Sequence, residues 1–328
     1  AVYPRSIGGA RSILSYLLPD RATPEFLRMH AELGSRHSFR EAARIMDTFL
    51  PCAPQSHVTV RNRLGRVAQQ LEDGSLNPAH KGLRDGGNTA GTTIFLDGAH
   101  IRSRPEYQRR HLDVLVGKTD GPRASRRFGL VKEGAASPVS LLRDELLKAG
   151  WRSGEPLTVL TDGEPALPYL VHLAAGRQLT HILDWWHISM RVQHVENAVK
   201  GLLQCQALSD PAVLFQRPTE RLRWWIWHGR SRLAVTRLQW LAVDCSRVRT
   251  EDPELRAAAS RAQTRCQTLL TYLSNNMGSL CDYGSRYLRG LPISTSRAEG
   301  CVDDIANARM GKKRRMRWSP RGAHRVAV

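Results

Sequence analysis

Two aspartates occupy matching positions at the ends of two apolar segments. Asp97 follows the segment 94–96 and Asp162 follows the segment 157–161, and a glycine succeeds each aspartate. If these segments are neighbouring strands of an open α/β sheet, about 4.8 Å apart, their carboxylates converge on one crevice. Two bare carboxylates that close repel each other, and Mg²⁺ removes that repulsion while also binding phosphate oxygens. A single Asp-Gly pair at a strand end is usually a turn, but two at corresponding points predict a metal site.

The two aspartates need a sheet that brings them together. From Thr92 the sequence alternates between segments with strand-like and helix-like patterns. In order, these are strands 92–103, 111–120 and 126–134, a helix 137–150, a strand 155–164, a helix 166–174 and a strand 178–187. This order predicts an α/β fold with an RNase H-like mixed sheet and flanking helices, in which right-handed helical crossovers reach the parallel strands.

Residues 1–72 are predicted to form a small, basic, helical DNA-binding region. Thr23, Ser38 and Ser56 each precede a stretch with apolar residues at helical spacing, so three capped helices are expected. The last two helices suit a helix-turn-helix that lays its second helix in the major groove, or equally a helical hairpin with a solvated basic face.

The third of these helices carries three arginines, which we expect to remain free of its apolar side and to bind DNA: Arg61, Arg63 and Arg66. Residues 73–91, rich in Gly, Asn and Asp, are predicted to be a linker.

The remaining chain is predicted to divide into three parts. Residues 92–199 form the first part of the α/β core, and residues 200–290 form an all-helical region that interrupts it. Residues 291–328 complete the core with a last helix, beginning near Ser296, and a basic tail.

The charge of the chain points to a polyanionic partner. The formal net charge is +19, and only seven of the 49 basic residues are lysines. Such a balance favours nucleic acid, because phosphate binding releases condensed counterions and arginine forks suit phosphate oxygens and guanine edges. No apolar run approaches the roughly 18 residues that would span a bilayer. The six cysteines are scattered, so we expect a cytoplasmic, nucleoid-associated protein with reduced thiols and no membrane partner.

Four motifs together carry a family resemblance. The segments FLDGAHIR, VLTDGEPAL, ILDWWHI and STSRAEGCVDDIANAR resemble DDE transposases of bacterial insertion sequences. More narrowly, they resemble the group allied to Mutator- and hAT-type transposases, which has a Cys/Asp-x-x-His signature after the second catalytic aspartate. Asp184 and His187 match that signature. The resemblance runs from about Thr92 to the C-terminus.

The resemblance implies that Asp97, Asp162 and Glu299 are the catalytic residues and hold two Mg²⁺ or Mn²⁺ ions. Glu299 is the least secure of the three, because other acids lie downstream of Asp162 and Asp303 shares a helical face with it. The distance in sequence from Asp162 to Glu299 exceeds that of a bare RNase H core and resembles families with a helical insertion at this point.

The activity implied is cleavage and strand transfer of double-stranded DNA, at the terminal repeats of an insertion sequence and at target DNA, by two-metal phosphoryl transfer. A homodimer or a larger synaptic complex is expected. The alternatives are a DNA-binding protein without catalysis, derived from a truncated or domesticated transposase, and an RNase H-like nuclease.

Three further features allow more than one interpretation. His187 either fixes the strand-to-helix junction by pairing with Asp184, which we favour, or lies beside the scissile phosphate; a zinc site is a remote third possibility. The cluster from Trp224 to Trp227 is either the core of the insertion or a surface that stacks on an unpaired base. A basic run near the C-terminus is either a solvated face or, as we favour, a clamp on the DNA backbone: Lys312, Lys313, Arg314, Arg315 and Arg317.

Overall fold

A computed structural model describes the chain with several gaps. It covers residues 18, 22–51, 53–73, 91–134, 137–176, 179–205, 215–248, 250–296, 300, 308–311 and 316–328. The predicted linker falls almost wholly outside these residues, as do Glu299 and the basic residues 312–315.

The described strands form one five-stranded mixed sheet in the order β3-β2-β1-β4-β5. The strands are β1 (Thr92–Arg102), β2 (His111–Asp120), β3 (Ser125–Val131), β4 (Leu157–Thr161) and β5 (Leu179–Leu183). The first three pair antiparallel as a meander, while β4 is parallel to β1 and β5 is parallel to β4. The chain therefore leaves the meander at β3 and reaches each parallel strand through a helix, as the sequence predicted.

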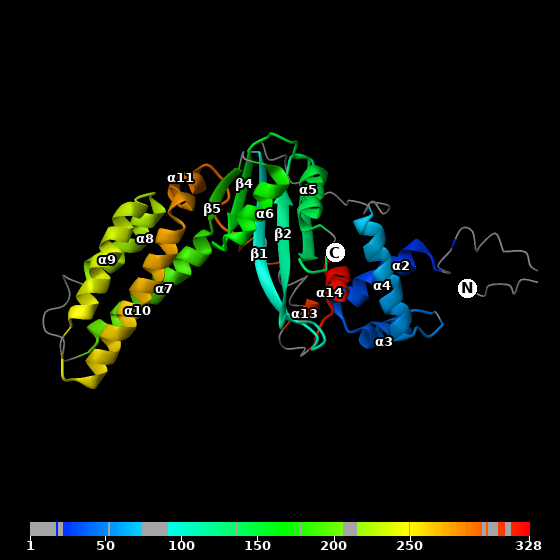
Figure 1. Ribbon diagram of the computed structural model, residues 1–328, viewed down its shortest axis with the longest axis horizontal. Coiled ribbons are helices and arrows are strands. Elements are labelled where there is room, and N and C mark those ends of the chain that lie inside the picture. The colour runs from blue at the N-terminus through cyan, green and yellow to red at the C-terminus, as the bar shows by residue number, and fades with distance from the viewer. Residues whose placement is uncertain are drawn as a thin grey trace, which may run out of the picture.

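Helices α5 (Pro138–Ala149) and α6 (Ala166–Ala175) supply these crossovers and cover one face of the sheet (Figure 1). The side chain of Ser137 caps α5 at its start, and Gly150 ends it with a left-handed φ of 100°. Both helices bury their apolar residues against alternate strand positions, including Ile94, Leu96 and Val159. The positions between them, such as Phe95 and Leu160, belong to the opposite face.

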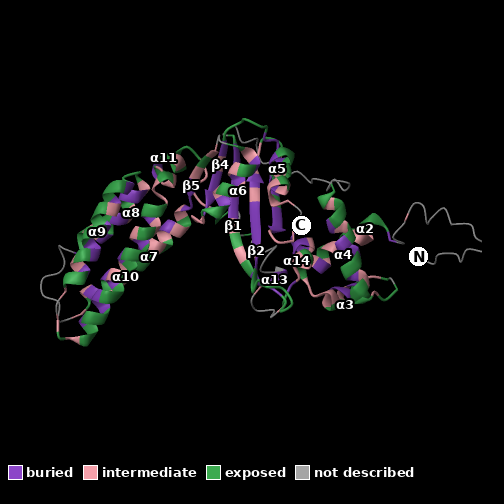
Figure 2. Cartoon of the chain, viewed as in Figure 1, coloured by how far each residue is buried: buried purple, intermediate pink, exposed green. Residues whose placement is uncertain are grey.

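A long helical arm extends from the β5 edge of the sheet (Figure 1). Its helices are α7 (Trp185–Leu203), α8 (Arg217–Trp227), α9 (Ser231–Arg247) and α10 (Pro253–Asn275), followed by η2 (Met277–Ser279) and α11 (Tyr283–Leu288). One continuous core joins Phe95, Leu160 and Ile182 of the sheet to the buried side of these helices. Figure 2 shows the result, with buried residues between the helices and exposed residues along their outer sides. The predicted boundary between residues 199 and 200 falls inside α7, which runs unbroken from the sheet into the arm.

Three helices form a unit at the other end of the molecule (Figure 1). They are α2 (Pro24–Arg36), α3 (Phe39–Phe49) and α4 (His57–Glu72), and each begins at the predicted cap: Thr23, Ser38 and Ser56 accept hydrogen bonds from first-turn N–H groups. Their small shared core contains Ala42, Met46 and Val60.

The C-terminal segment joins this unit to the sheet. It contains α13 (Ala308–Met310) and α14 (Pro320–Ala327). Trp318 bridges to Ser103 beyond the end of β1, and Val326 packs in one core with Leu64 of α4 and Val131 of β3. The described part of the predicted basic tail is therefore a packed structural element. In the described part of the chain, every helix is too short or too polar to span a bilayer.

Candidate active site

Three aspartates lie level with one another where the parallel pairing of β1, β4 and β5 ends; Asp97 itself lies within β1, opposite Val116 of β2. Phe95 of β1 pairs with Leu160 of β4, and Thr161 of β4 pairs with Leu183 of β5. Continuing these registers by two residues and one residue respectively aligns Asp97, Asp162 and Asp184. Since neighbouring strands lie about 4.8 Å apart and side chains alternate with period two, all three carboxylates share the face that also carries Phe95.

The electrostatics of Asp97 reflect its burial and its two acidic neighbours. Burial raises the pKa of Asp97, and the negative charges of Asp162 and Asp184 raise it further, against the opposing effects of the Gly98 N–H and the charge of His187. The Gly98 N–H donates to Oδ1 of Asp97 at 2.8 Å. The site thus contains negative charge that the described residues balance only in part.

The loop that carries Asp162 is held by the helical arm. The hydroxyl of Tyr272, on α10, donates to the backbone oxygen of Asp162 at 2.7 Å, and the guanidinium of Arg191, on α7, lies 4.2 Å from the centre of the Tyr272 ring. Gly163 follows with φ of 100°, and a Cβ there would lie 2.9 Å from Leu183. The chain therefore turns sharply at Asp162 in a conformation that favours glycine.

A second hydrogen-bond network, from β5 and η2, holds the same loop. His181 of β5 links the hydroxyl of Thr161, 2.8 Å from its Nε2, to that of Ser279 in η2, 2.7 Å from its Nδ1. The Thr161 hydroxyl also accepts from the Gly163 N–H at 3.2 Å. Burial lowers the pKa of His181, which keeps the imidazole neutral and able to accept from one hydroxyl and donate to the other.

Asp184 is a structural hub. Its side chain has no exposed surface, and its carboxylate accepts from the N–H of Trp186 at 3.1 Å, from the N–H of Thr295 at 3.1 Å and from the Thr295 hydroxyl at 3.0 Å. The Nδ1 of His187 lies 2.6 Å from Oδ2. Burial acts to raise the pKa of Asp184, but these hydrogen bonds prevail and lower it. With its oxygens so occupied, Asp184 is a positioning group rather than a metal ligand.

The Asp184–His187 contact agrees with the interpretation that the pair fixes the strand-to-helix junction. Asp184 also caps α7, because it accepts from the N–H of Trp186 in the first turn. The hydrogen bond to Asp184 raises the pKa of His187 against the effect of burial, and the charges of Asp162 and Asp97 raise it further. His187 therefore lies beside the same acidic cluster, whose charges favour its protonated form.

The third predicted acid, Glu299, lies outside the described residues. Among the residues that are described, no group of three or more His, Cys, Asp or Glu side chains is arranged to hold a metal ion. Asp97 and Asp162 are the described carboxylates of the cluster that remain available as ligands.

The predicted DNA-binding arginines divide into two groups. Arg61, Arg66 and Arg317 are exposed. Arg63 is not, and the expectation that its guanidinium remains free is wrong: its Nη1 lies 3.1 Å from Nε2 of the buried His30 and donates to Oε1 of Gln55 at 3.1 Å. Helix α4 turns Arg63 inward because it lies three residues after the buried Val60, on the side that packs against α2.

The tryptophan cluster of α8 also divides. Trp225 is buried in the core of the arm, and Trp227 packs against that core. Trp224 is 46% exposed, and the guanidinium of Arg230 lies 4.8 Å from the centre of its ring. The core interpretation therefore holds for Trp225, while Trp224 presents an indole to solvent.

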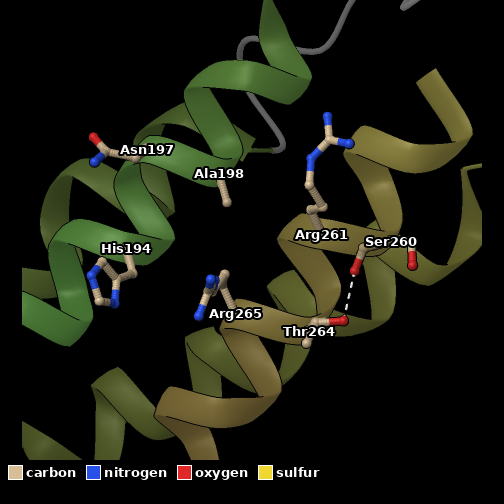
Figure 3. A pocket seen from close by; sticks show the side chains of 7 residues that line it. All are labelled: His194, Asn197, Ala198, Ser260, Arg261, Thr264 and Arg265. Carbon is tan, nitrogen blue, oxygen red and sulfur yellow. Dashed lines mark hydrogen bonds between the residues drawn. The ribbon is translucent and has the colours of Figure 1, made fainter. Parts of the chain in front are cut away.

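A shallow pocket lies between α7 and α10 in the arm (Figure 3). His194 and Asn197 reach it from α7, and Arg261 and Arg265 from α10. Thr264 lies on its rim and donates to the Ser260 backbone oxygen at 2.9 Å. The pocket contains none of the clustered aspartates, so it is not part of the acidic site.

Sequence reasoning missed the residues that hold the Asp162 loop, namely Tyr272, Arg191, His181 and Ser279. Tyr272 and Ser279 lie far along the chain from Asp162, and no local pattern marks them. His181 did carry a signal, because a histidine is unusual within an apolar strand segment next to a candidate site.

Comparison with known proteins does not assign the chain. No protein-family model matches it, and no curated protein sequence is significantly similar to it.

Proposed function

We propose that this chain is a DDE transposase with an RNase H-like catalytic fold, which cuts and rejoins double-stranded DNA with the help of divalent metal ions. The observation that carries the proposal is the alignment of Asp97, Asp162 and Asp184 at the same level of three parallel strands. The strand order β3-β2-β1-β4-β5, with a three-stranded meander before the crossovers, supports the RNase H-like assignment.

The acidic cluster fits a hard divalent cation such as Mg²⁺ or Mn²⁺. Asp97 and Asp162 offer carboxylate oxygens, the ligands that these ions prefer. Burial, and then the charges of its neighbours, raise the pKa of Asp97, so ionising this carboxyl costs free energy. A cation bound beside it would offset that cost. A cation bound there supplies charge neutralisation for a phosphate group and lowers the pKa of a coordinated water or hydroxyl.

Glu299 remains our candidate for the third ligand. Asp184 holds Thr295, and Glu299 follows Thr295 by four residues. Four residues of chain span at most about 14 Å, a length that permits Glu299 to reach the cluster.

His187 has a role in this proposal beyond the junction. Its Nδ1 is engaged by Asp184, which leaves Nε2 to donate to a phosphate oxygen when the imidazole is protonated. The three aspartate charges favour that protonated form.

The test is cleavage of DNA by the full chain. Duplex DNA that contains the sequences flanking its gene, an RNA–DNA hybrid and a four-way junction are offered side by side with Mg²⁺, Mn²⁺ or EDTA. We expect cleavage of the duplex, dependent on the metal, and a loss of about 10³-fold in rate for Asp97→Asn, Asp162→Asn and Glu299→Gln, because a lost ligand removes several kcal/mol of transition-state stabilisation.

Asp144→Asn, an exposed carboxylate on α5, is the matched control and should cleave as the wild type does. Equal cleavage by Asp97→Asn would refute the proposal. Binding of duplex without cleavage under any metal would favour the non-catalytic DNA-binding protein, and preference for the hybrid would favour the nuclease.

A further inference from the structure

A basic groove lies between the N-terminal helical unit and the C-terminal segment. It is bounded by one side of α4, the chain beyond β1 and the segment that leads into α14. Besides the buried Arg309, five arginines line it: Arg61, Arg66, Arg104, Arg317 and Arg325. Among the described residues that line the groove there is no aspartate or glutamate. Outside the lining, Oε1 of Glu106 lies 3.6 Å from Nη1 of Arg104.

Backbone hydrogen bonds hold two walls of the groove together. The N–H of Trp318 donates to the Arg102 oxygen at 2.9 Å, and the N–H of Arg104 donates to the Trp318 oxygen at 3.0 Å. The arginines at 104 and 317 are therefore brought side by side by an extension of the sheet, although they lie more than two hundred residues apart in the chain.

The third wall, helix α4, approaches closely through a glycine. A Cβ at Gly65 would lie 3.2 Å from Nη1 of Arg325. The Arg325 side chain thus runs across α4 at this position, between the levels of Arg61 and Gln69, which share one helical face with Gly65.

The floor of the groove is packed around a buried arginine. Arg309 is buried, with its guanidinium 5.0 Å from the centre of the Phe39 ring and 5.1 Å from that of Trp318. Its Nε also donates to the Gly34 oxygen at 3.4 Å. Trp318 is itself buried, and the half-buried ring of Phe39 packs against two core clusters as well as Arg309, so neither ring stands exposed in the floor for a base to stack on.

We propose that this groove binds the sugar–phosphate backbone of duplex DNA, so that α4 and the C-terminal segment act as one DNA-binding surface. The inference deepens the proposed function by assigning its substrate a docking surface. Arginine guanidinium groups match phosphate oxygens in geometry and charge. Five of them, distributed over three chain segments, exceed what one small anion requires and suit a polymer of repeated phosphates.

This floor, with neither ring exposed, favours a duplex over a single strand. Proteins that bind single strands combine a basic groove with exposed aromatic side chains on which bases stack. This groove has the charge without the stacking surface. Contacts to phosphate fix position but carry no sequence information, so binding here is expected to be independent of base sequence.

The experiment measures the salt dependence of binding by fluorescence anisotropy, with the full chain, EDTA and a labelled duplex of arbitrary sequence. The test variant combines Arg61→Ser with Arg317→Ser. The matched control combines Arg143→Ser with Arg152→Ser, which removes the same charge from two exposed positions in and just after α5. Melting temperatures verify that both variants fold.

We expect the groove variant to flatten the slope of log affinity against log salt by roughly 1.8, which is about 0.9 for each lost phosphate contact, and the control to leave the slope close to that of the wild type. Equal changes of the slope in both variants would show an effect of net charge alone and would refute DNA binding by the groove. Tighter binding of a single strand or of RNA through the same arginines would overturn the duplex assignment.

The outcome also separates this inference from the proposed function. If the wild type binds and cleaves duplex and the groove variant binds it equally well at every salt concentration, only the groove inference is refuted. If the wild type binds no duplex at low salt, both the groove inference and the proposed function are refuted.

Discussion

Asp184 is a carboxylate with no exposed surface that joins three parts of the molecule: the end of β5, the start of α7 and the segment that leads toward Glu299. Each donor that it satisfies, among them both polar hydrogens of Thr295, would be left without a partner if the carboxylate were removed. The cost of such a loss is the desolvation of every orphaned donor.

We predict that Asp184→Ala lowers the free energy of unfolding by about 3 kcal/mol or more, since removing one member of a buried polar network leaves the others uncompensated. Asp184→Asn, which keeps one acceptor oxygen, should lose less. Chemical denaturation measures both. Asp144→Ala, at an exposed site on α5, should change stability by less than about 0.5 kcal/mol; a similar small change for Asp184→Ala would contradict the hub.

His30 and Arg63 form a buried pair that makes stability depend on pH. The Nδ1 of His30 lies 2.7 Å from the Phe26 backbone oxygen, which can only accept, so Nδ1 carries the proton and Nε2 accepts from Arg63. Burial lowers the pKa of His30, and the charge of Arg63 lowers it further. Because the folded pKa lies below the unfolded one, the unfolded chain binds more protons as pH falls, and the stabilisation present above pH 6.5 is lost.

Accordingly, the stability of the wild type should decrease between pH 7.5 and pH 5.5, and His30→Gln should weaken that dependence. Each unit of difference between the folded and unfolded pKa of His30 corresponds to about 1.4 kcal/mol of stability. Thermal melts across this range provide the measurement. His100→Gln, at an exposed histidine, is the control. A wild type and a His30→Gln variant with parallel pH profiles would rule the pair out as a source of the dependence.

At the scale of elements, the helical arm and the sheet meet at the Asp162 loop. Tyr272 reaches that loop from α10, and Ser279 reaches it through His181 from η2. The arm therefore braces a catalytic candidate from outside the sheet. Its contribution is to position the loop, since the described side chains of the arm add no further acid to the cluster.

Removing the Tyr272 hydroxyl should loosen the loop. We expect Tyr272→Phe to lower stability by about 1 kcal/mol, the usual net worth of one hydrogen bond, and to lower metal-dependent DNA cleavage roughly tenfold if that energy is needed to position Asp162. Tyr287→Phe, at a tyrosine that is 64% exposed on α11, should change neither. Loss of stability without loss of cleavage would make Tyr272 a purely structural residue.

The centre of the sheet contains a glycine that a side chain would disrupt. At Gly117 in β2, a Cβ would lie 2.5 Å from the Phe128 ring and 2.8 Å from the Phe95 backbone oxygen. Gly117→Ala should therefore destabilise the protein by about 1–3 kcal/mol through overpacking. Gly201→Ala, in α7 with open space around it, should instead stabilise by up to about 1 kcal/mol. Differential scanning calorimetry distinguishes the two, and a neutral Gly117→Ala would contradict the close packing.

Local signals in the sequence sufficed for the elements but not for their assembly. Thr23, Ser38, Ser56, Ser137 and Gly150 mark helix ends because capping is a short-range interaction, and the alternation of apolar residues marks the strands. The level placement of Asp97 and Asp162 also followed, since strand order and the side-chain period fix it. The burial of Arg63 and the contact of Tyr272 with the Asp162 loop depend on which helix faces pack together. No short-range pattern in the sequence specifies that packing.

At the scale of the whole molecule, His324 connects the two ends of the described chain to the sheet. It lies on α14, with its Nε2 2.6 Å from Oε1 of Glu72 at the end of α4, and its Nδ1 accepts from the Val131 N–H at 3.2 Å. The helical unit at the N-terminal end is thus attached to the β3 edge through the C-terminal helix, rather than only through residues 74–90.

A double-mutant cycle of Glu72→Gln and His324→Ala should reveal this attachment. Because the two groups are in direct contact, we expect a coupling energy of about 1–3 kcal/mol in the free energy of unfolding. The pair Glu254, exposed at the start of α10 in the arm, and His324 provides the comparison and should show additivity within about 0.5 kcal/mol. Additivity for Glu72 and His324 as well would mean that the contact does not hold the unit to the sheet.

The backbone hydrogen bond from Trp185 to Ile293, 2.9 Å long, closes the base of the arm. The chain departs from the sheet and returns to it at adjacent points, although Asp184 and Thr295 are 111 residues apart in sequence. Because the two ends of this long excursion touch, its length can change without breaking a strand. The inner end of the arm shares a core with the sheet and holds the Asp162 loop, so lengthening and grafting are open to the outer part of the arm, while the sheet and the inner end keep the aspartates in line.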